Sequence, residues 1–151
     1  DGKLDLVVAN SGSTTVSVLL NNGDGTYMVK VDFATGVSPQ SVTIGDFDGV
    51  NGPDLAMAMA TSTLGTMWVL LNDGTGDFTA RSTYATGTSP QPVAVGDLDG
   101  VNGPDLTVAN FIDNTVSVLL NNGCGTYVAK VDYPTGLGLK SVAVGNFDGI
   151  K

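Results

Sequence analysis

The chain has 151 residues, 42% of them hydrophobic, and a formal net charge of −9. This length suffices for one domain that buries about 68–70% of its unfolded surface. Six basic residues against fifteen aspartates argue against nucleic-acid binding. No apolar run approaches the roughly 18 residues of a membrane-spanning helix, so we expect no membrane insertion.

The chain consists of three copies of one unit, offset by 51 and 49 residues. The segment LLNNGDGTY at residues 19–27 returns as LLNDGTGDF at 70–78 and as LLNNGCGTY at 119–127. A second segment, FATGVSPQSVTIGDF at 33–47, also returns twice with the same offsets. No window has a sustained helical period, and the Asn-Gly-rich turns predict β-hairpins.

Each unit predicts four short strands, which in the middle unit cover residues 41–47, 54–60, 66–72 and 77–84. Short strands with tight turns and a period near 50 residues indicate the blades of an all-β propeller, built from four-stranded antiparallel sheets. The predicted units are a first blade at about 1–36 without its first strand, a second at 37–87, a third at 88–136, and a spare first strand within 137–151. Three blades make a partial ring or half of a six-bladed ring.

An acidic loop organises each unit. It reads GDFDGVNGPDL at residues 45–55 and GDLDGVNGPDL at 96–106, without a Lys or Arg. If Asp46, Asp48 and Asp54 converge, each pair at 4 Å repels by about 4 kcal/mol at an effective dielectric of 20. A hard cation held by oxygen ligands would offset this repulsion, and Ca²⁺ fits best. The alternative interpretation is that these residues only form turns between strands.

The acidic loop and the hairpin turn together resemble the FG-GAP-like (VCBS) repeat, which builds the integrin α-subunit propeller and secreted propellers, including lectins. The resemblance covers the whole chain. It implies a calcium loop in each blade, with these ligands: Asp46, Asp48, Val50, Gly52 and Asp54 in one loop, and Asp97, Asp99, Val101, Gly103 and Asp105 in the next. Val50 and Val101 stand where the family often has Asp. Each loop thus has one carboxylate fewer, which predicts weak binding, with a Kd of about 10⁻⁴–10⁻³ M.

Two partial loops stand at the ends of the sequence. Asp1 and Asp5 correspond to the second half of the motif, and Asn146 and Asp148 to the first half. We expect a second copy to complete the loop in a homodimer that closes a six-bladed ring, or flanking blades of a longer parent chain to do so. The unpaired second strand, at residues 4–10, favours strand recruitment in either case.

Three further residues are candidates for contact with a ligand. Trp68 replaces the serines of the sister units and could stack on a sugar, although a packing substitution is the favoured interpretation. Gln40 and Gln91 precede the first strand of their blades and could line one mouth of the ring. The alternative is that both are solvated turn residues.

The composition argues against an enzyme. The chain has no His and no Glu, and nothing activates its single cysteine, Cys124. The motif aspartates recur in every blade, as structural ion sites do. We therefore expect a non-catalytic, secreted or cell-surface module that binds Ca²⁺ and presents a face to a protein or glycan ligand. The alternative is a purely structural propeller segment of a larger secreted protein or enzyme.

Overall fold

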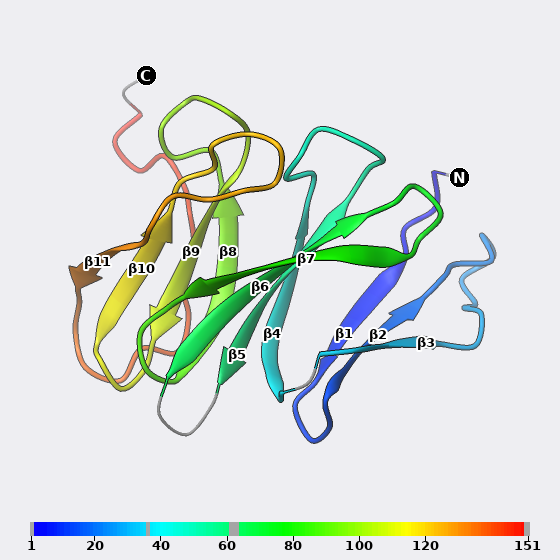
Figure 1. Ribbon diagram of the computed structural model, residues 1–151, viewed down its shortest axis with the longest axis horizontal. Helices are drawn as coiled ribbons and strands as arrows, with labels where there is room; N and C mark the ends of the chain where they lie inside the picture. Colours follow the sequence, from blue (N-terminus) through cyan, green and yellow to red (C-terminus); the bar gives the residue numbers. More distant parts are fainter. Residues whose placement is uncertain (1, 36, 61–63, 150–151) are drawn as a thin grey trace.

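The computed structural model describes residues 2–35, 37–60 and 64–149. Its elements are β-strands in three antiparallel sheets, which we call the first, second and third blade (Figure 1). The described residues include no helix, and hence none with the length and apolar character of a membrane span. The predicted all-β propeller architecture is confirmed as a partial, open ring.

The first blade has three strands and the other two have four. The first blade comprises β1 (Leu6–Asn10), β2 (Thr15–Leu19) and β3 (Val31–Ala34). The second comprises β4 (Pro39–Gly45), β5 (Asp54–Ala60), β6 (Gly65–Asn72) and β7 (Phe78–Ala85). The third comprises β8 (Pro90–Gly96), β9 (Asp105–Asn110), β10 (Thr115–Leu119) and β11 (Val131–Pro134).

Strand β5 joins the neighbouring blades because large and small side chains alternate along it. Its sequence alternates large Leu55, Met57 and Met59 with small Ala56 and Ala58. The large side chains pack in an apolar cluster with residues of the first blade, and the alanines pack in a second cluster with residues of the third. Because successive side chains of a strand point to opposite faces, one strand serves both interfaces. This accounts for the almost complete burial of β5.

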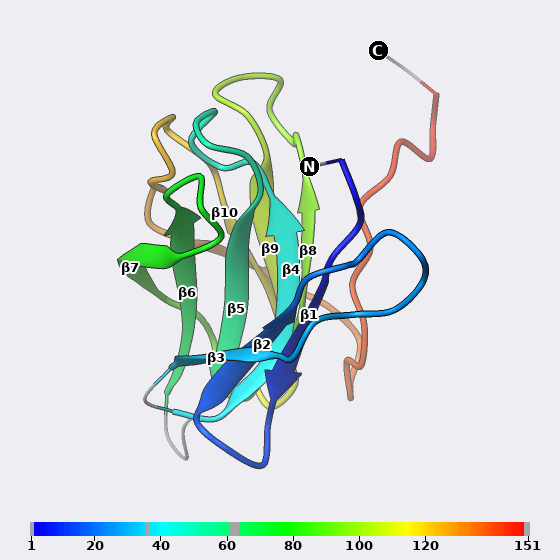
Figure 2. The ribbon, with the colours of Figure 1, turned by 90° about the vertical axis from the view of Figure 1, so that its right-hand side faces the viewer.

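The innermost strands of successive blades lie side by side (Figure 2). β4 and β8 belong to different sheets, and the Val93 main-chain N–H donates a 3.3 Å hydrogen bond to the Ser41 hydroxyl between them. Main-chain ladders join the strands within a blade, whereas β4 and β8 of successive blades form no ladder with each other.

The predicted strand at 141–147 is not formed in this chain: the segment pairs with no strand among the residues that the structure describes. A strand requires a neighbour that exchanges main-chain hydrogen bonds with it. The segment instead runs beside β8 and meets it through side chains. The Val144 side chain lies so close to Gly96 that a Cβ at that glycine would come within 2.6 Å of it.

Candidate metal centre

The first acidic loop connects β4 to β5 and begins with two side-chain-to-backbone turns. Asp46 accepts a 2.8 Å hydrogen bond from the Gly49 main-chain N–H, and Asp48 accepts one of the same length from Val50. Positive φ angles at Gly49 and Asn51 then reverse the chain direction. Glycine and asparagine adopt this conformation more readily than other residues, which explains their place in the loop.

The second acidic loop, between β8 and β9, repeats this geometry. Asp97 accepts a 2.7 Å hydrogen bond from the Gly100 N–H, and Asp99 accepts a 3.0 Å one from Val101. The chain again reverses at a residue with positive φ, Asn102, at 61°. Two loops of equal sequence pattern thus have equal local structure.

The last aspartate of each loop is fully buried at the start of a strand. Asp54 accepts a 2.7 Å hydrogen bond from the Phe47 N–H and a 2.8 Å one from the Asn72 N–H. Asp105 accepts the corresponding bonds from Leu98 and Asn121. Each buried carboxylate therefore fixes both the start of its own loop and the hairpin that follows in its blade.

The environment of Asp54 penalises its negative charge. Burial raises the pKa of Asp54 above its ordinary value. The two amide hydrogen bonds lower this pKa, while the nearby charges of Asp48 and Asp46 raise it again. A carboxylate beside two others in a desolvated position gains most from a cation.

The structure brings the predicted carboxylates together in both loops. One oxygen from each of Asp46, Asp48 and Asp54 lies within 4.8 Å of the others. The same holds for the second set, formed by Asp97, Asp99 and Asp105. All six donors are hard oxygens, which are the ligands that Ca²⁺ takes in proteins.

The remaining predicted ligands occupy different positions. Val50 and Val101 are exposed at the loop tips, and Gly52 and Gly103 have φ angles of 90° and 93°. In the partial loops, Asp5 accepts a 2.8 Å hydrogen bond from the Asn21 N–H. At the other end, the Asn146 side chain accepts a 2.8 Å hydrogen bond from the Gly149 N–H, and Asp148 is exposed. Asp1 lies outside the described residues.

The two partial loops do not meet within one chain. Figure 1 shows the N-terminal and C-terminal ends at opposite ends of the long axis of the molecule. The blue segment before β1 lies on the side of the first blade, and the red segment after β11 lies on the side of the third.

The three candidate ligand-contacting residues lie on β6, β4 and β8. One face of the half-buried Trp68 ring is covered by Arg81, whose guanidinium carbon is 4.1 Å from the ring centroid. Gln40 donates a 3.1 Å hydrogen bond to the Ser38 hydroxyl, and the Gln91 amide donates to the Pro90 carbonyl.

Sequence reasoning missed the role of Asn121. Its side-chain amide donates a 2.9 Å hydrogen bond to the Phe47 main-chain oxygen in the acidic loop of the preceding blade, and a 3.1 Å one to Pro104. Gly125 donates a 3.0 Å bond to the same Phe47 oxygen. The recurrence of Leu-Leu-Asn was visible, but the hairpin turn alone explained it.

The fold and the two acidic clusters define a partial β-propeller with an oxygen-rich loop between the first two strands of its complete blades. Residues 1–56 match the sequence model of the FG-GAP-like repeat. The predicted resemblance to this repeat is confirmed over these residues. Such repeats are typical of extracellular proteins. No curated protein matches the chain.

Proposed function

We propose that the chain is a non-catalytic, calcium-binding β-propeller module of an extracellular protein. The observation that carries this proposal is the convergence of three carboxylates in each of two equivalent loops. Their mutual repulsion and the burial of the third aspartate make the loop costly without a cation. A divalent cation with oxygen ligands offsets both terms, and the flexible coordination of Ca²⁺ suits an irregular loop better than the strict octahedron of Mg²⁺.

The affinity follows from the number of charged ligands. Each loop has three carboxylates, because Val50 and Val101 occupy the middle position. We therefore expect dissociation constants of about 10⁻⁴–10⁻³ M, the range of extracellular modules. At millimolar calcium concentrations such sites are substantially filled.

Isothermal titration calorimetry with CaCl₂ tests this proposal. We expect two ions per chain, one for each cluster. The pair Asp46→Asn and Asp48→Asn should remove one ion, and Asp97→Asn with Asp99→Asn should remove the other. The matched control is Asp73→Asn, an exposed carboxylate in a hairpin turn whose acceptor role toward Thr75 an amide retains. Unchanged stoichiometry in both double variants would refute the assignment.

Within this module, a face that binds protein or glycan is the first candidate for the biological role. A purely structural role is the second, and the cover of Arg81 over Trp68 favours it, because a covered ring is a poor platform for a sugar. A glycan array and a pull-down with the purified chain distinguish them. Capture that Trp68→Ala abolishes supports the binding role, and absence of capture in calcium supports the structural one.

A further inference from the structure

The junction between the second and third blades is filled by a phenylalanine. Phe47, which is 1% exposed, packs its ring edge-on against Tyr127, and Tyr127 packs in turn against Tyr84. The Phe47 N–H donates to Asp54, and its carbonyl accepts from Asn121 and Gly125. The Phe47 ring thus fills an apolar space between the blades, and its main-chain N–H and oxygen form hydrogen bonds with both blades.

The junction between the first and second blades has matching residues at the same positions, but they surround a cavity. Phe33 and Phe78, which match Tyr84 and Tyr127, pack edge-on with their ring centroids 5.3 Å apart. Asp5 matches Asp54, and Asn72 and Gly76 match Asn121 and Gly125. The residue that would match Phe47 comes from no described part of the chain, and a cavity of about 90 Å³ lies in its place.

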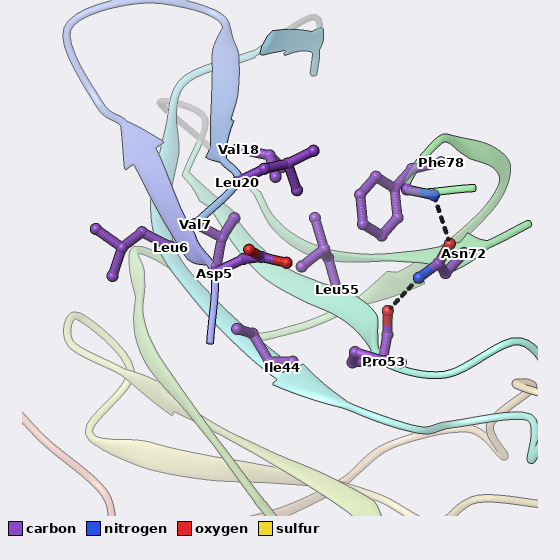
Figure 3. A pocket seen from close by; sticks show the side chains of 11 residues that line it. Asp5, Leu6, Val7, Val18, Leu20, Ile44, Pro53, Leu55, Asn72 and Phe78 are labelled. Carbon is purple, nitrogen blue, oxygen red and sulfur yellow. Dashed lines mark hydrogen bonds between the residues drawn. The ribbon is translucent and has the colours of Figure 1, made fainter. Parts of the chain in front are cut away.

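This cavity, which we call the socket, is lined mainly by apolar side chains. Figure 3 shows the side chains that surround it, among them Asp5, Val7, Val18, Leu20, Leu55 and Phe78. A larger groove of about 660 Å³ shares Asp5, Leu20 and Asn72 with it and continues toward Asn22. Among the described strands, β1 beside the socket pairs with β2 alone, whereas its counterpart β5 pairs with a strand on both edges.

The segment at 141–148 has the sequence that such a socket takes. It reads SVAVGNFD, beside SVTIGDFD at 41–48 and PVAVGDLD at 92–99, which fill the corresponding positions of the second and third blades. In its own chain Phe147 is 91% exposed. Because Val144 packs over Gly96, the segment already lies where the inner strand of a following blade belongs.

The outer faces of the first and third blades are also complementary. Val118 and Leu120 line an apolar cavity of about 370 Å³ on the third blade. They match Val69 and Leu71, which the third blade covers on the second. On the first blade Tyr27 is 37% exposed, whereas its match Tyr127 is 6% exposed against the second blade. The first blade can therefore cover the third blade of another copy.

We infer that the socket binds residues 141–148 of a second copy of this chain. Phe147 of each copy enters the socket of the other, its N–H donates to Asp5, and its carbonyl accepts from Asn72 and Gly76. The incoming segment pairs with the unpaired edge of β1. Each copy has one socket and one segment, so a two-fold arrangement fills both and closes a six-bladed ring. This inference does not depend on the cation.

Light scattering during size-exclusion chromatography, in chelator, tests the inference. We expect a mass of about 31 kDa, which is twice the 15.3 kDa of the chain. Phe147→Ser should give a monomer, because it removes the ring that enters the socket of the other copy. The fold of each chain should survive the change, since this ring is exposed in the isolated chain. Leu137→Ser is the matched control: this side chain is 90% exposed but lies outside the segment, so the dimer should persist.

A mixing experiment separates docking from misfolding. Leu20→Arg places a charge in the socket and should also give a monomer. An equal mixture of the two monomeric variants has one intact socket and one intact segment, so it should regain a dimer. A monomeric wild type at micromolar concentration overturns the second copy as occupant. If that monomer binds a synthetic peptide of residues 139–149, the socket takes such a segment from preceding residues of a longer chain.

Discussion

Asn121 of the third blade donates its side-chain amide to the main-chain oxygen of Phe47, in the acidic loop of the second blade, at 2.9 Å. The Asn121 main-chain N–H also donates to Asp105, in the acidic loop of its own blade. One buried residue is thus bonded to both candidate metal loops. Order in the loops and contact between the blades are physically linked through it.

Asn121→Ala should reduce the free energy of unfolding by about 1–3 kcal/mol, because it removes a buried amide and leaves its acceptors short of a donor. Urea denaturation measures this loss. The matched control is Asn72→Ala, whose side-chain amide donates to Pro53 within its own blade. Both variants should also carry Phe147→Ser, so that no second copy contributes. Equal losses would contradict a special role for the bond to Phe47.

The sequence predicted the fold well because its periodicity is local and repeated. Alternation and turn residues located β5 at 54–60, as the structure has it, and the Asp-x-Asp-Gly pattern predicted clusters that the structure brings together. The strand at 141–147 could not be predicted correctly, because its pairing depends on a neighbour rather than on its residues. The bond of Asn121 to Phe47 also escaped, because it joins residues 74 positions apart.

Val50→Asp should change the thermal stability in opposite directions with and without calcium. In chelator, a fourth carboxylate adds repulsion and lowers the melting temperature. In millimolar CaCl₂ the added charge strengthens calcium binding. Binding then stabilises the folded state by RT ln(1 + [L]/Kd), which raises the melting temperature. At ten times Kd this is about 1.4 kcal/mol, or a few degrees. Differential scanning calorimetry measures both shifts.

Val50→Asn is the matched control for this reversal, since it changes the polarity of the same exposed position without charge. It should leave the calcium response of the wild type unchanged. A Val50→Asp melting temperature that shifts in the same direction under both conditions would contradict ion binding at this loop.

Asp32 should contribute to stability at neutral pH and lose that contribution in acid. The Lys30 ammonium and the Ser17 hydroxyl lower the pKa of Asp32. A lowered folded-state pKa gives stability that is fully present above the unfolded value of about 3.9 and is lost as the pH falls through the folded value.

Melting temperatures measured from neutral pH down to acid test this sign. Asp32→Asn should lower the melting temperature at neutral pH and have less effect at the acid end. Asp77→Asn serves as a control on an exposed carboxylate that accepts a hydrogen bond from the amide of the next residue. A deficit of the Asp32 variant that grows toward acid would contradict the assignment.

The central claim is that the acidic loops hold calcium, and a crystal structure determined in saturating CaCl₂ tests it most directly. We expect anomalous density between Asp46, Asp48 and Asp54, with carboxylate oxygens about 2.3–2.6 Å from its centre. The second cluster, at Asp97, Asp99 and Asp105, should show the same peak. Ordered loops with water in these positions at saturating calcium would contradict the claim.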